Sequence, residues 1–340
     1  MFKKPSLLLV ISLLLLCSCT SKQEEEQNRE IPGRVSYDFF DTVSYIYNYG
    51  NDSQDEFEDT SDAVFEILRE YHYLTDIYHS YEGINNIYTI NENAGDPVEV
   101  DERLIEFLKY CKELYYMTDG KTNILLGSVL KIWHAYREEG TSVPEYDLLS
   151  DANQHTDIEL LEIDEENRTV TLLDENASID VGAIAKGYAT EKAAQYLAEA
   201  GKESYVLNIG GNIRIIGYKT DGSDWTTGVI DPNDTDNFAV HIHLADTAFV
   251  TSGDYIRYYV VDQKRYHHII DPDTLFPADY FRSVSIYCSD SGMADALSTA
   301  LFCMSYEDGL ALAEKYGFGV IWIYADGTIK TTKNLENLIY

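Results

Sequence analysis

The sequence predicts an α+β fold, with mostly antiparallel or mixed sheets into which helices are inserted in groups. Two observations lead to this prediction. Short β-branched and aromatic runs follow one another at hairpin spacing over residues 204–288, and apolar residues recur at helical spacing in only a few separate segments. The sequence lacks the regular strand–helix alternation of a doubly wound sheet, a Walker loop and an internal repeat.

The N-terminal stretch predicts export rather than a part of the folded core. A basic start and an apolar run over residues 7–16 are typical of a signal peptide, too short to remain as a spanning helix. The polar residues that follow have no periodicity and predict a solvated tether. We therefore expect a signal peptide over 1–18, a lipidated cysteine and flexible tether over 19–36, and one folded domain over 37–340.

The cysteine at the end of the apolar run predicts a lipid anchor. Ser18 stands directly before Cys19 and Leu16 lies three residues before it, which resembles a bacterial lipobox. That resemblance implies cleavage before Cys19, lipidation of its thiol, and attachment to the extracytoplasmic face of the cell membrane. Cys17 is a poorer candidate because bulky Leu16 precedes it. An ordinary secretory signal with incidental cysteines is the alternative.

Charge and cysteine content exclude two classes of function. The formal net charge of −34 leaves no basic stripe for nucleic acid, so we expect no such partner. Cys111, Cys288 and Cys303 have no metal-type spacing, and we expect Cys111 and Cys303 in the core. Against this acidic background, any local group of positive residues is informative.

The first half of the chain predicts helices with connecting loops and one hairpin, from apolar periodicity and capping residues. The expected elements are a strand over 39–46, an acidic loop over 51–59, a helix over 61–79 with Tyr78 on its inward stripe, a loop over 80–91, a helix after the N-cap Asp101 that ends at the Thr118-Asp-Gly120 turn, a short helix around 130–133 with a polar stretch after it, and a hairpin of 158–163 with 169–173.

The second half predicts one long helix and then mostly strands. The expected elements are a helix after residue 187 that ends at Gly201, two strands joined through Gly210-Gly211, strands around 229–230, 240–244, 248–251, 258–261, 266–273 and 282–288, helices over 292–304 and 306–316, and a final hairpin of 320–324 with 329–332.

The stretch DVGAIAKGYA, residues 180–189, concentrates one carboxylate, two glycines and a lysine where an extended run gives way to a helix. A turn of this kind can present backbone N–H groups and a helix N-terminus to an anion. A tight turn with a surface lysine is the alternative on these ten residues alone.

Two later loops have the composition of reactive sites. Residues 251–257, TSGDYIR, place hydroxyls, a glycine and an arginine after a strand, which suits a phosphorylated or carboxylated group. Residues 265–272 contain His267 and His268 before an aspartate, which suits a general base. Adjacent strand residues point to opposite faces, so both histidines cannot reach one site. A strand-end turn and a solvent-facing histidine are the alternatives.

A third segment, residues 291–302, predicts a helix that carries oxygen ligands. Asp295 and Thr299 are four residues apart and share one face of it. A carboxylate with a hydroxyl one turn further on suits Mg²⁺, which keeps few protein ligands. The alternative is a carboxylate that favours the positive helix end and a threonine bonded to a backbone carbonyl.

Taken in order, five runs closely resemble the ApbE-type FAD:protein FMN transferase family. They are DVGAIAKGYA, LNIGGNI, TSGDY, HIIDP and ADALSTALF, and residues 39–43 and the turn at 118–120 match as well. The likeness covers roughly residues 37–335. It implies an ApbE-like flavin transferase fold and a Mg²⁺-dependent transfer of FMN from FAD to a threonine or serine hydroxyl, with AMP leaving. The partner implied is an acceptor flavoprotein subunit that carries an FMN-binding domain.

The resemblance also implies roles for particular residues. Asp295, Thr299 and the backbone carbonyl of Ala183 would be the Mg²⁺ ligands. His268 would be the catalytic base. The residues expected to bind the flavin cofactor are Lys186, Ile270, Gly210, Gly211 and Ser252, together with the loop Lys121, Thr122 and Asn123. That loop departs from the usual Ala-Phe-Asp of the family, which places its contact with the adenosine end of FAD in question.

Two other readings of the same motifs stay open. A hydrolase on this scaffold would convert FAD to FMN and AMP with water in place of the acceptor. A non-catalytic lipoprotein would bind flavin only, although a pure binder has no need of a metal at the pyrophosphate. Asp180 is expected to anchor its turn rather than take part in the chemistry.

Overall fold

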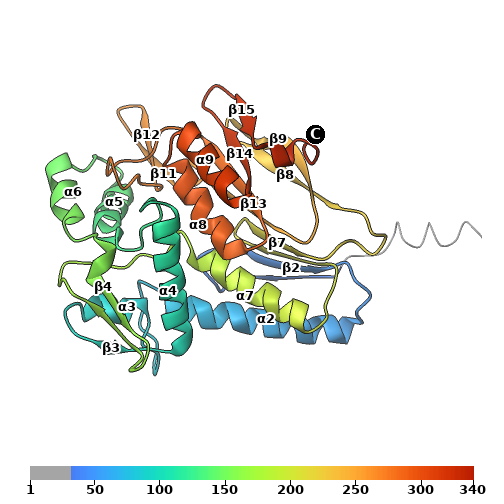
Figure 1. Ribbon diagram of the computed structural model, residues 1–340, viewed down its shortest axis with the longest axis horizontal. Coiled ribbons are helices and arrows are strands. Elements are labelled where there is room, and N and C mark those ends of the chain that lie inside the picture. The colour runs from blue at the N-terminus through green and yellow to red at the C-terminus, as the bar shows by residue number, and fades with distance from the viewer. Residues whose placement is uncertain (1–31) are drawn as a thin grey trace, which may run out of the picture.

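The structure is a computed structural model that describes residues 32–340. It confirms the predicted α+β class. One antiparallel sheet of eight strands runs through the molecule in the order β1-β2-β6-β7-β10-β13-β14-β15. Figure 1 shows helices in front of this sheet and a second group of helices beside it. The predicted signal peptide, Cys19 and most of the tether lie outside the described residues.

The strands of the large sheet have two buried faces. Val250 packs among apolar residues of the helices, whereas its neighbour Phe249 packs on the opposite side with Trp225 and Ile321. The strands are β1 (Gly33–Ser36), β2 (Ser44–Asn48), β6 (Tyr205–Ile209), β7 (Asn212–Ile216), β10 (Ala248–Gly253), β13 (Ser283–Cys288), β14 (Gly319–Ile323) and β15 (Ile329–Thr331).

Helices cover one face of the sheet and a hairpin covers the other. The helices are α2 (Gln54–Thr75), α7 (Ala185–Glu199), α8 (Ser291–Phe302) and α9 (Tyr306–Tyr316), and the hairpin is β8 (Trp225–Asp231) with β9 (Asp234–Leu244). Leu297, Ala300 and Leu301 of α8 belong to the same apolar cluster as Val250 and Ile286 of the sheet. The sheet therefore holds α8 in a fixed position.

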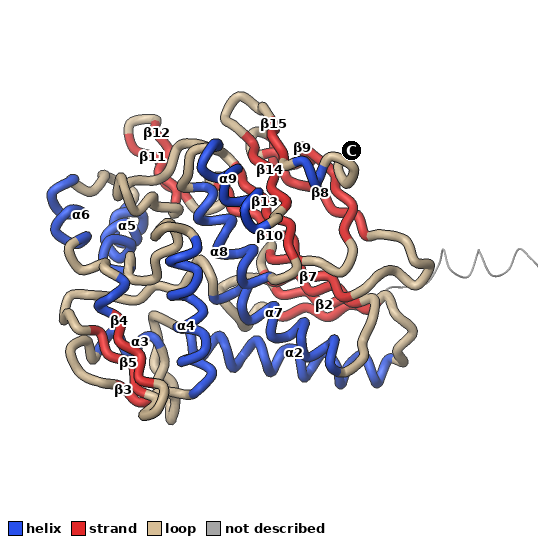
Figure 2. Tube along the Cα trace, viewed as in Figure 1, coloured by secondary structure: helices blue, strands red, loops and turns tan. Residues whose placement is uncertain are grey.

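The second group of elements is built from residues 87–172 and one later hairpin. It contains α3 (Ile87–Glu92), α4 (Glu102–Met117), α5 (Gly127–Glu139), α6 (Tyr146–Asn153), the sheet of β3 (Val98–Glu99), β5 (Thr169–Leu172) and β4 (Leu161–Asp164), and the hairpin β11 (Tyr258–Val261) with β12 (Lys264–His267). Figure 2 shows that hairpin apart from the large sheet. Its Tyr266 stacks on Trp133 of α5, with ring centroids 6.0 Å apart. Short 3₁₀ helices cover Ile158–Leu160 and Lys333–Leu335.

Several predicted elements are confirmed, each by a local signal. Asp101 caps α4 by accepting from the N–H of Arg103, and Gly201 follows α7 with a positive φ of 67°. Gly210 and Gly211 form the turn between β6 and β7. The 158–173 hairpin, α8, α9 and the final hairpin also lie where they were expected.

Other predictions near the N-terminus were wrong. The strand expected from residue 39 begins only at Ser44, because Phe40 and Asp41 have positive φ and form a turn. The acidic loop expected over 51–59 is largely the start of α2, capped by Ser53. Acidic residues in a first helical turn face the positive helix end, so their clustering favours a helix start. Residues 33–36, assigned to the tether, pair with β2 as the edge strand β1.

Three further boundaries differ from the expectation. Helix α2 ends at Thr75, and Tyr78 is 53% exposed rather than on an inward stripe. Helices α3 and α6 lie in stretches expected to be loop. The strand expected over 266–273 stops at His267, and of the residues that follow, Ile270 forms only an isolated bridge to Pro277. Within residues 32–340, no helix is long and apolar enough to cross a membrane.

Candidate functional site

The candidate site is formed where the start of α7 meets α8, two helices more than 100 residues apart in sequence (Figure 1). Gly187 makes this approach possible. A Cβ atom there would lie 2.3 Å from the backbone oxygen of Ser291 and 2.5 Å from the Cβ of Asp295. The N–H of Gly187 donates to Oδ2 of Asp295 over 2.9 Å. The glycine of the 180–189 motif is therefore needed for close packing and for holding the carboxylate.

Asp295 lies at the centre of this contact and is only 5% exposed. Lys186 brings a positive charge beside it, with Nζ 3.8 Å from Oδ2. The same Nζ lies 3.5 Å from the carbonyl of Gly182. A buried carboxylate requires compensation by charge and hydrogen bonds, and these residues supply both. The structure thus brings together two residues that the sequence assigned to different roles.

The carbonyl of Ala183 is free to bind a cation. No residue of the described chain donates a hydrogen bond to it, because Gly187, which could close the first helical turn onto it, donates to Asp295 instead. Oδ1 of Asp295 likewise has no hydrogen-bond partner within residues 32–340. Carbonyl and carboxylate oxygens are the ligands that Mg²⁺ prefers. The donor set therefore fits the magnesium ion that the family resemblance implies.

Thr299, the third predicted ligand, lies one turn of α8 beyond Asp295 and is half-buried. Its Oγ1 lies 3.5 Å from Oγ of Ser252 at the end of β10, and the same Ser252 hydroxyl lies 2.7 Å from Oγ of Ser298. Ser252 is thus joined to α8 by hydroxyl contacts. The predicted cofactor-binding serine and the predicted metal-ligating threonine are neighbours.

Asp180 anchors the turn that precedes α7. Its Oδ1 accepts from the N–H of Gly182 over 2.9 Å, and its own N–H donates to the carbonyl of Ile124. Desolvation raises the pKa of Asp180, and the Gly182 N–H offsets part of that rise. These contacts agree with the anchoring role expected from the sequence.

The two histidines have different surroundings, although β12 ends at His267 and His268 lies beyond the strand. His267 is buried, and its Nε2 donates to the carbonyl of Ala278 over 2.8 Å. His268 remains partly accessible, and its Nδ1 lies 3.3 Å from the carbonyl of Arg257. A carbonyl can only accept, so this contact places the imidazole proton on Nδ1 and leaves Nε2 free to accept one.

The protonation of His268 is set by its surroundings. Desolvation, followed by the positive charge of Arg257 and smaller contributions from His267 and Arg137, lowers the pKa of His268 to about 3. At neutral pH the imidazole is therefore uncharged, as a general base must be. An anion bound beside Arg257 and Arg137 would offset their positive charges and raise the pKa of His268.

The remaining predicted cofactor residues are glycines and one isoleucine. A Cβ at Gly210 would lie 2.4 Å from Oγ1 of Thr42, whereas Gly211 has open space around it. Both are exposed at the β6–β7 turn. Ile270, within the HIIDP segment, is buried in an apolar cluster with Trp133 and Leu275. Within residues 32–340, no hydrogen bond or ion pair joins these three residues to the carboxylate of Asp295, and their role toward flavin stays a prediction.

The loop Lys121, Thr122 and Asn123 is held by other parts of the protein. Lys121 forms ion pairs with Asp271 at 2.7 Å and with Asp273 at 2.8 Å. The hydroxyl of Thr122 donates to the carbonyl of Ala296, and the side-chain amide of Asn123 donates to that of Thr156. Lys121 and Thr122 thus position the loop against the HIIDP segment and α8, and Asn123 ties it to the segment that follows α6. Direct binding of FAD by these side chains stays a prediction.

Comparison with known proteins identifies the family. The model of the ApbE family matches residues 39–322 of this chain. The chain belongs to the ApbE family. Among curated relatives, the FAD:protein FMN transferase of Treponema pallidum is 33% identical over 267 residues, which is 74% of each chain. That of Vibrio cholerae is 30% identical over 322 residues, or 93% of this chain and 92% of the relative.

Solved structures of the ApbE family share the fold. The ApbE protein of Thermotoga maritima superposes with a TM-score of 0.82 and 29% identity, covering 91% of this chain and 99% of that one. A mutant of the flavin transferase ApbE from Vibrio cholerae superposes with a TM-score of 0.78 and 25% identity, covering 91% and 100%. These values confirm the ApbE-like fold expected from the sequence.

The structure of this ApbE-family chain also places residues near the site that the sequence analysis did not select. Tyr78 lies close enough to Arg137 and Arg257 for both charges to influence its pKa, which burial raises. His134 of α5 lies beside them, with its ring 5.9 Å from that of Tyr78 and its Nδ1 3.0 Å from Arg137. The TSGDYIR composition pointed to Arg257. No local pattern distinguishes Tyr78, His134 or Arg137.

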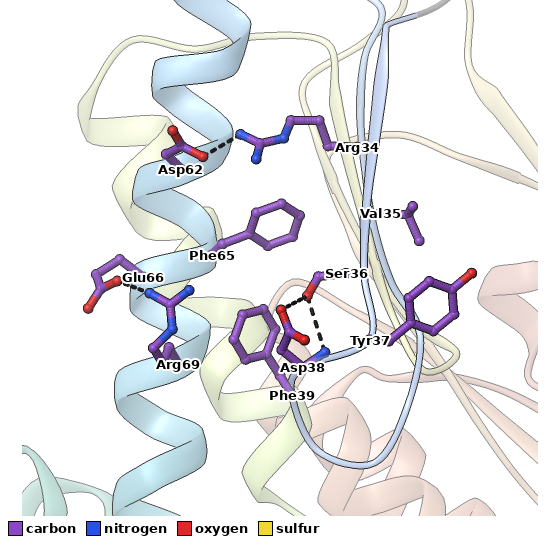
Figure 3. Close-up of a pocket in the computed structure, with 10 residues that line it drawn as sticks. All are labelled: Arg34, Val35, Ser36, Tyr37, Asp38, Phe39, Asp62, Phe65, Glu66 and Arg69. Carbon is purple, nitrogen blue, oxygen red and sulfur yellow. Dashed lines mark hydrogen bonds and ion pairs between the residues drawn. The ribbon is translucent and has the colours of Figure 1, made fainter.

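A hollow of about 500 Å³ elsewhere on the surface is a poorer candidate (Figure 3). It lies between β1 and α2. Its arginines are already paired, Arg34 with Asp62 and Arg69 with Glu66. Val35 points away from it in Figure 3. With its charges satisfied, this hollow offers no reactive group.

Proposed function

We propose that this chain transfers the FMN moiety of FAD to a threonine or serine hydroxyl of an acceptor flavoprotein subunit that carries an FMN-binding domain. The observation that carries the proposal is the meeting of a buried Asp295, the free carbonyl of Ala183 and the ammonium of Lys186. Such a group suits a metal-assisted reaction at a phosphate. The curated relatives named FAD:protein FMN transferase support the choice of substrates.

Asp295, Thr299 and the Ala183 carbonyl would hold Mg²⁺ in this proposal. When bound, the ion would offset the negative charge of the pyrophosphate and of the transition state. Lys186 supplies a further positive charge 3.8 Å from Asp295. These charges matter more here than in a neutral protein, because a pyrophosphate enters a chain whose formal net charge is −34.

The proposed reaction forms one phosphorus–oxygen bond and breaks another. The acceptor hydroxyl oxygen attacks the phosphorus of the FMN half of FAD, and AMP leaves with the electron pair of the pyrophosphate bond. Nε2 of His268 takes the hydroxyl proton. A positioned base activates an alcohol that is otherwise a poor nucleophile. The products are an FMN phosphoester on the acceptor and free AMP.

Two alternatives differ in what replaces the acceptor. An FAD pyrophosphatase would use water and release FMN and AMP, and a flavin-binding lipoprotein would release neither. The free Ala183 carbonyl beside Asp295 favours a catalytic protein over a pure binder, because flavin storage requires no cation there. The reaction products distinguish the transferase from the pyrophosphatase.

One assay tests the proposal. The protein is incubated with FAD, Mg²⁺ and a purified FMN-binding acceptor subunit, and covalent flavin fluorescence on a denaturing gel is measured together with AMP. We expect equal amounts of labelled acceptor and AMP. The variant Asp295→Asn should abolish both, whereas Asp236→Asn, an exposed residue of β9 with the same loss of charge, should leave both unchanged.

Other outcomes contradict specific parts of the proposal. AMP without labelled acceptor would replace the transferase by a hydrolase. FAD binding without AMP would indicate a binder. Full labelling by Asp295→Asn, or labelling that persists after removal of divalent cations with a chelator, would remove the metal assignment.

We further propose that the protein works at the extracytoplasmic face of the cell membrane, anchored by lipid on Cys19. The lipobox-like Leu16-Cys-Ser-Cys19 supports this proposal. The polar stretch up to residue 32 would separate the folded domain from the bilayer. Acceptors would then be membrane proteins with flavin domains on the same face.

A further inference from the structure

Two arginines of the described chain have no acidic partner. Of the nine arginines within residues 32–340, seven form ion pairs and only Arg137 and Arg257 do not. The paired ones are Arg34, Arg69, Arg103, Arg168, Arg214, Arg265 and Arg282. In a chain with 59 acidic and 25 basic side chains, an unpaired arginine is unexpected. Two unpaired arginines in this acidic chain suggest that both are kept free for the same ligand.

The two arginines are neighbours although 120 residues separate them. Arg137 stands in the last turn of α5, and Arg257 lies between β10 and β11. The charge of Arg137 lowers the pKa of Arg257, after the larger effect of desolvation, and both arginines act on His268 and on Tyr78. The fold brings their segments together: the carbonyl of Arg257 lies 3.3 Å from Nδ1 of His268, and Trp133, one helical turn before Arg137, stacks on Tyr266 with ring centroids 6.0 Å apart. Both guanidinium groups therefore lie within electrostatic range of the proposed base.

Nearby groups leave this pair uncompensated. The guanidinium of Arg257 forms no hydrogen bond to any described residue, and Arg137 contacts only Nδ1 of His134, at 3.0 Å. The carboxylates of Asp295 and Asp180 are near enough to raise the pKa of Arg257, but neither is within ion-pair distance. Like charges that are held together without a counter-ion repel each other. A bound anion would remove that repulsion.

The position of the two arginines in the fold indicates which anion they bind. Both arginines act on the pKa of His268, the carbonyl of Arg257 lies 3.3 Å from its Nδ1, and Arg257 is within electrostatic reach of Asp295. Planar guanidinium groups bind phosphate oxygens with two parallel hydrogen bonds. Meanwhile Lys121, the cation of the predicted cofactor loop, is already occupied by Asp271 and Asp273.

We propose that Arg137 and Arg257 form an anion subsite that binds the pyrophosphate of FAD. The subsite rests on the proposed function in that FAD is its ligand. Arg257 reaches it from the segment between β10 and β11, and Arg137 from the last turn of α5. Binding the pyrophosphate there also brings negative charge next to His268 and makes its imidazole a stronger base.

The test compares two flavins that differ in phosphate. FAD and riboflavin share the isoalloxazine ring, but riboflavin carries no phosphate. Their dissociation constants are measured by calorimetry for the wild-type protein and for Arg257→Gln, Arg137→Gln and the double variant. We expect each single variant to bind FAD about 10- to 100-fold more weakly, as for a lost charge-assisted hydrogen bond, with riboflavin unchanged.

Matched variants separate a local contact from a general charge effect. Arg168→Gln removes the same charge from an exposed arginine of the β4–β5 turn, and should leave FAD binding unchanged. Arg257→Lys keeps the charge without the planar fork and should restore only part of the affinity. Because neither arginine has an acidic partner to lose, the glutamine variants should melt at or above the wild-type temperature.

The results decide the subsite and the function separately. FAD and riboflavin weakened equally, or FAD affinity unchanged in the double variant, would overturn the subsite even if the wild-type protein labels its acceptor. A wild-type protein that binds FAD with the expected arginine dependence but labels no acceptor would keep the subsite and overturn the transferase.

Discussion

At the scale of single residues, His268 links stability to pH. Its pKa is about 3 in the folded chain against 6.5 as the ordinary value. Between these values the unfolded chain binds more protons than the folded one, so the free energy of unfolding falls as the pH falls. The stabilisation is complete above about pH 6.5 and is lost toward pH 3. His72 and His267, whose pKa values burial also lowers, act in the same direction.

We predict that His268→Gln weakens this dependence. Urea unfolding at pH 7 and pH 5 should show a wild-type loss that exceeds the loss of the variant by about 1 kcal/mol, allowing for solvent access. Asp180 and Glu191, whose pKa values are raised by desolvation, act in the opposite direction in both proteins, so the difference reports on His268. Parallel curves for the two proteins would contradict the low pKa.

The same variant examines the proposed base. With Nε2 replaced, acceptor labelling should slow by about 100-fold or more while FAD binding is kept. Labelling at the normal rate would remove His268 from the mechanism.

At the scale of elements, the contact of α7 with α8 determines the site. A methyl group at Gly187 would meet the Ser291 carbonyl and the Cβ of Asp295. We predict that Gly187→Ala separates the helices, destabilises the fold by about 1–3 kcal/mol, and weakens acceptor labelling because Asp295 loses its N–H donor. Both are measured on the purified protein, by denaturant unfolding and by the gel assay.

Gly309 in α9 provides the matched control. A Cβ there meets Trp322 and Leu301 at 3.5 Å and 3.6 Å, which is ordinary contact. Gly309→Ala should stabilise the protein by up to about 1 kcal/mol through helix propensity, without a change in activity. Equal effects of the two substitutions would mean that the close helix contact does not matter.

The elements also show which features a sequence can predict. Asp101, Gly201 and the Gly210-Gly211 turn act within a few residues of themselves, and their predictions were confirmed. The start of α2 was missed because an acidic run reads equally as a loop or as a first helical turn. Strand β1 was missed because four residues carry little periodicity, and pairing with β2 decides their state.

For the candidate site, too, some residues could be predicted from the sequence and others could not. Its ordered motifs contain Asp295 and Ala183, whose proximity follows from the family resemblance and not from any spacing. Arg137 could not be selected, since an arginine without an acidic partner looks like any other in a sequence. Only the fold places it next to Arg257.

At the scale of the whole molecule, the folded domain must be considered with the segment that precedes it. The described domain contains no spanning helix within residues 32–340, and its charge gives it no attraction to anionic lipid. In our proposal, lipid on Cys19 retains the protein at the membrane. Acceptor subunits embedded in that membrane would meet the enzyme at a high local concentration.

We predict that Cys19→Ser releases the protein from the membrane. The serine cannot be lipidated, so the variant should move from the membrane pellet to the soluble fraction, or remain as an uncleaved precursor, and should lose incorporation of a labelled fatty acid. Cys17→Ser, two residues earlier, is the control and should stay lipidated because Leu16 disfavours cleavage before residue 17.

Purified Cys19→Ser protein should label a soluble acceptor domain at the wild-type rate, since the site lies wholly within residues 121–299. Fatty-acid incorporation that survives Cys19→Ser but is lost in Cys17→Ser would move the anchor to Cys17, and incorporation that survives both substitutions, or is absent from the wild-type protein, would remove the lipid anchor on Cys19.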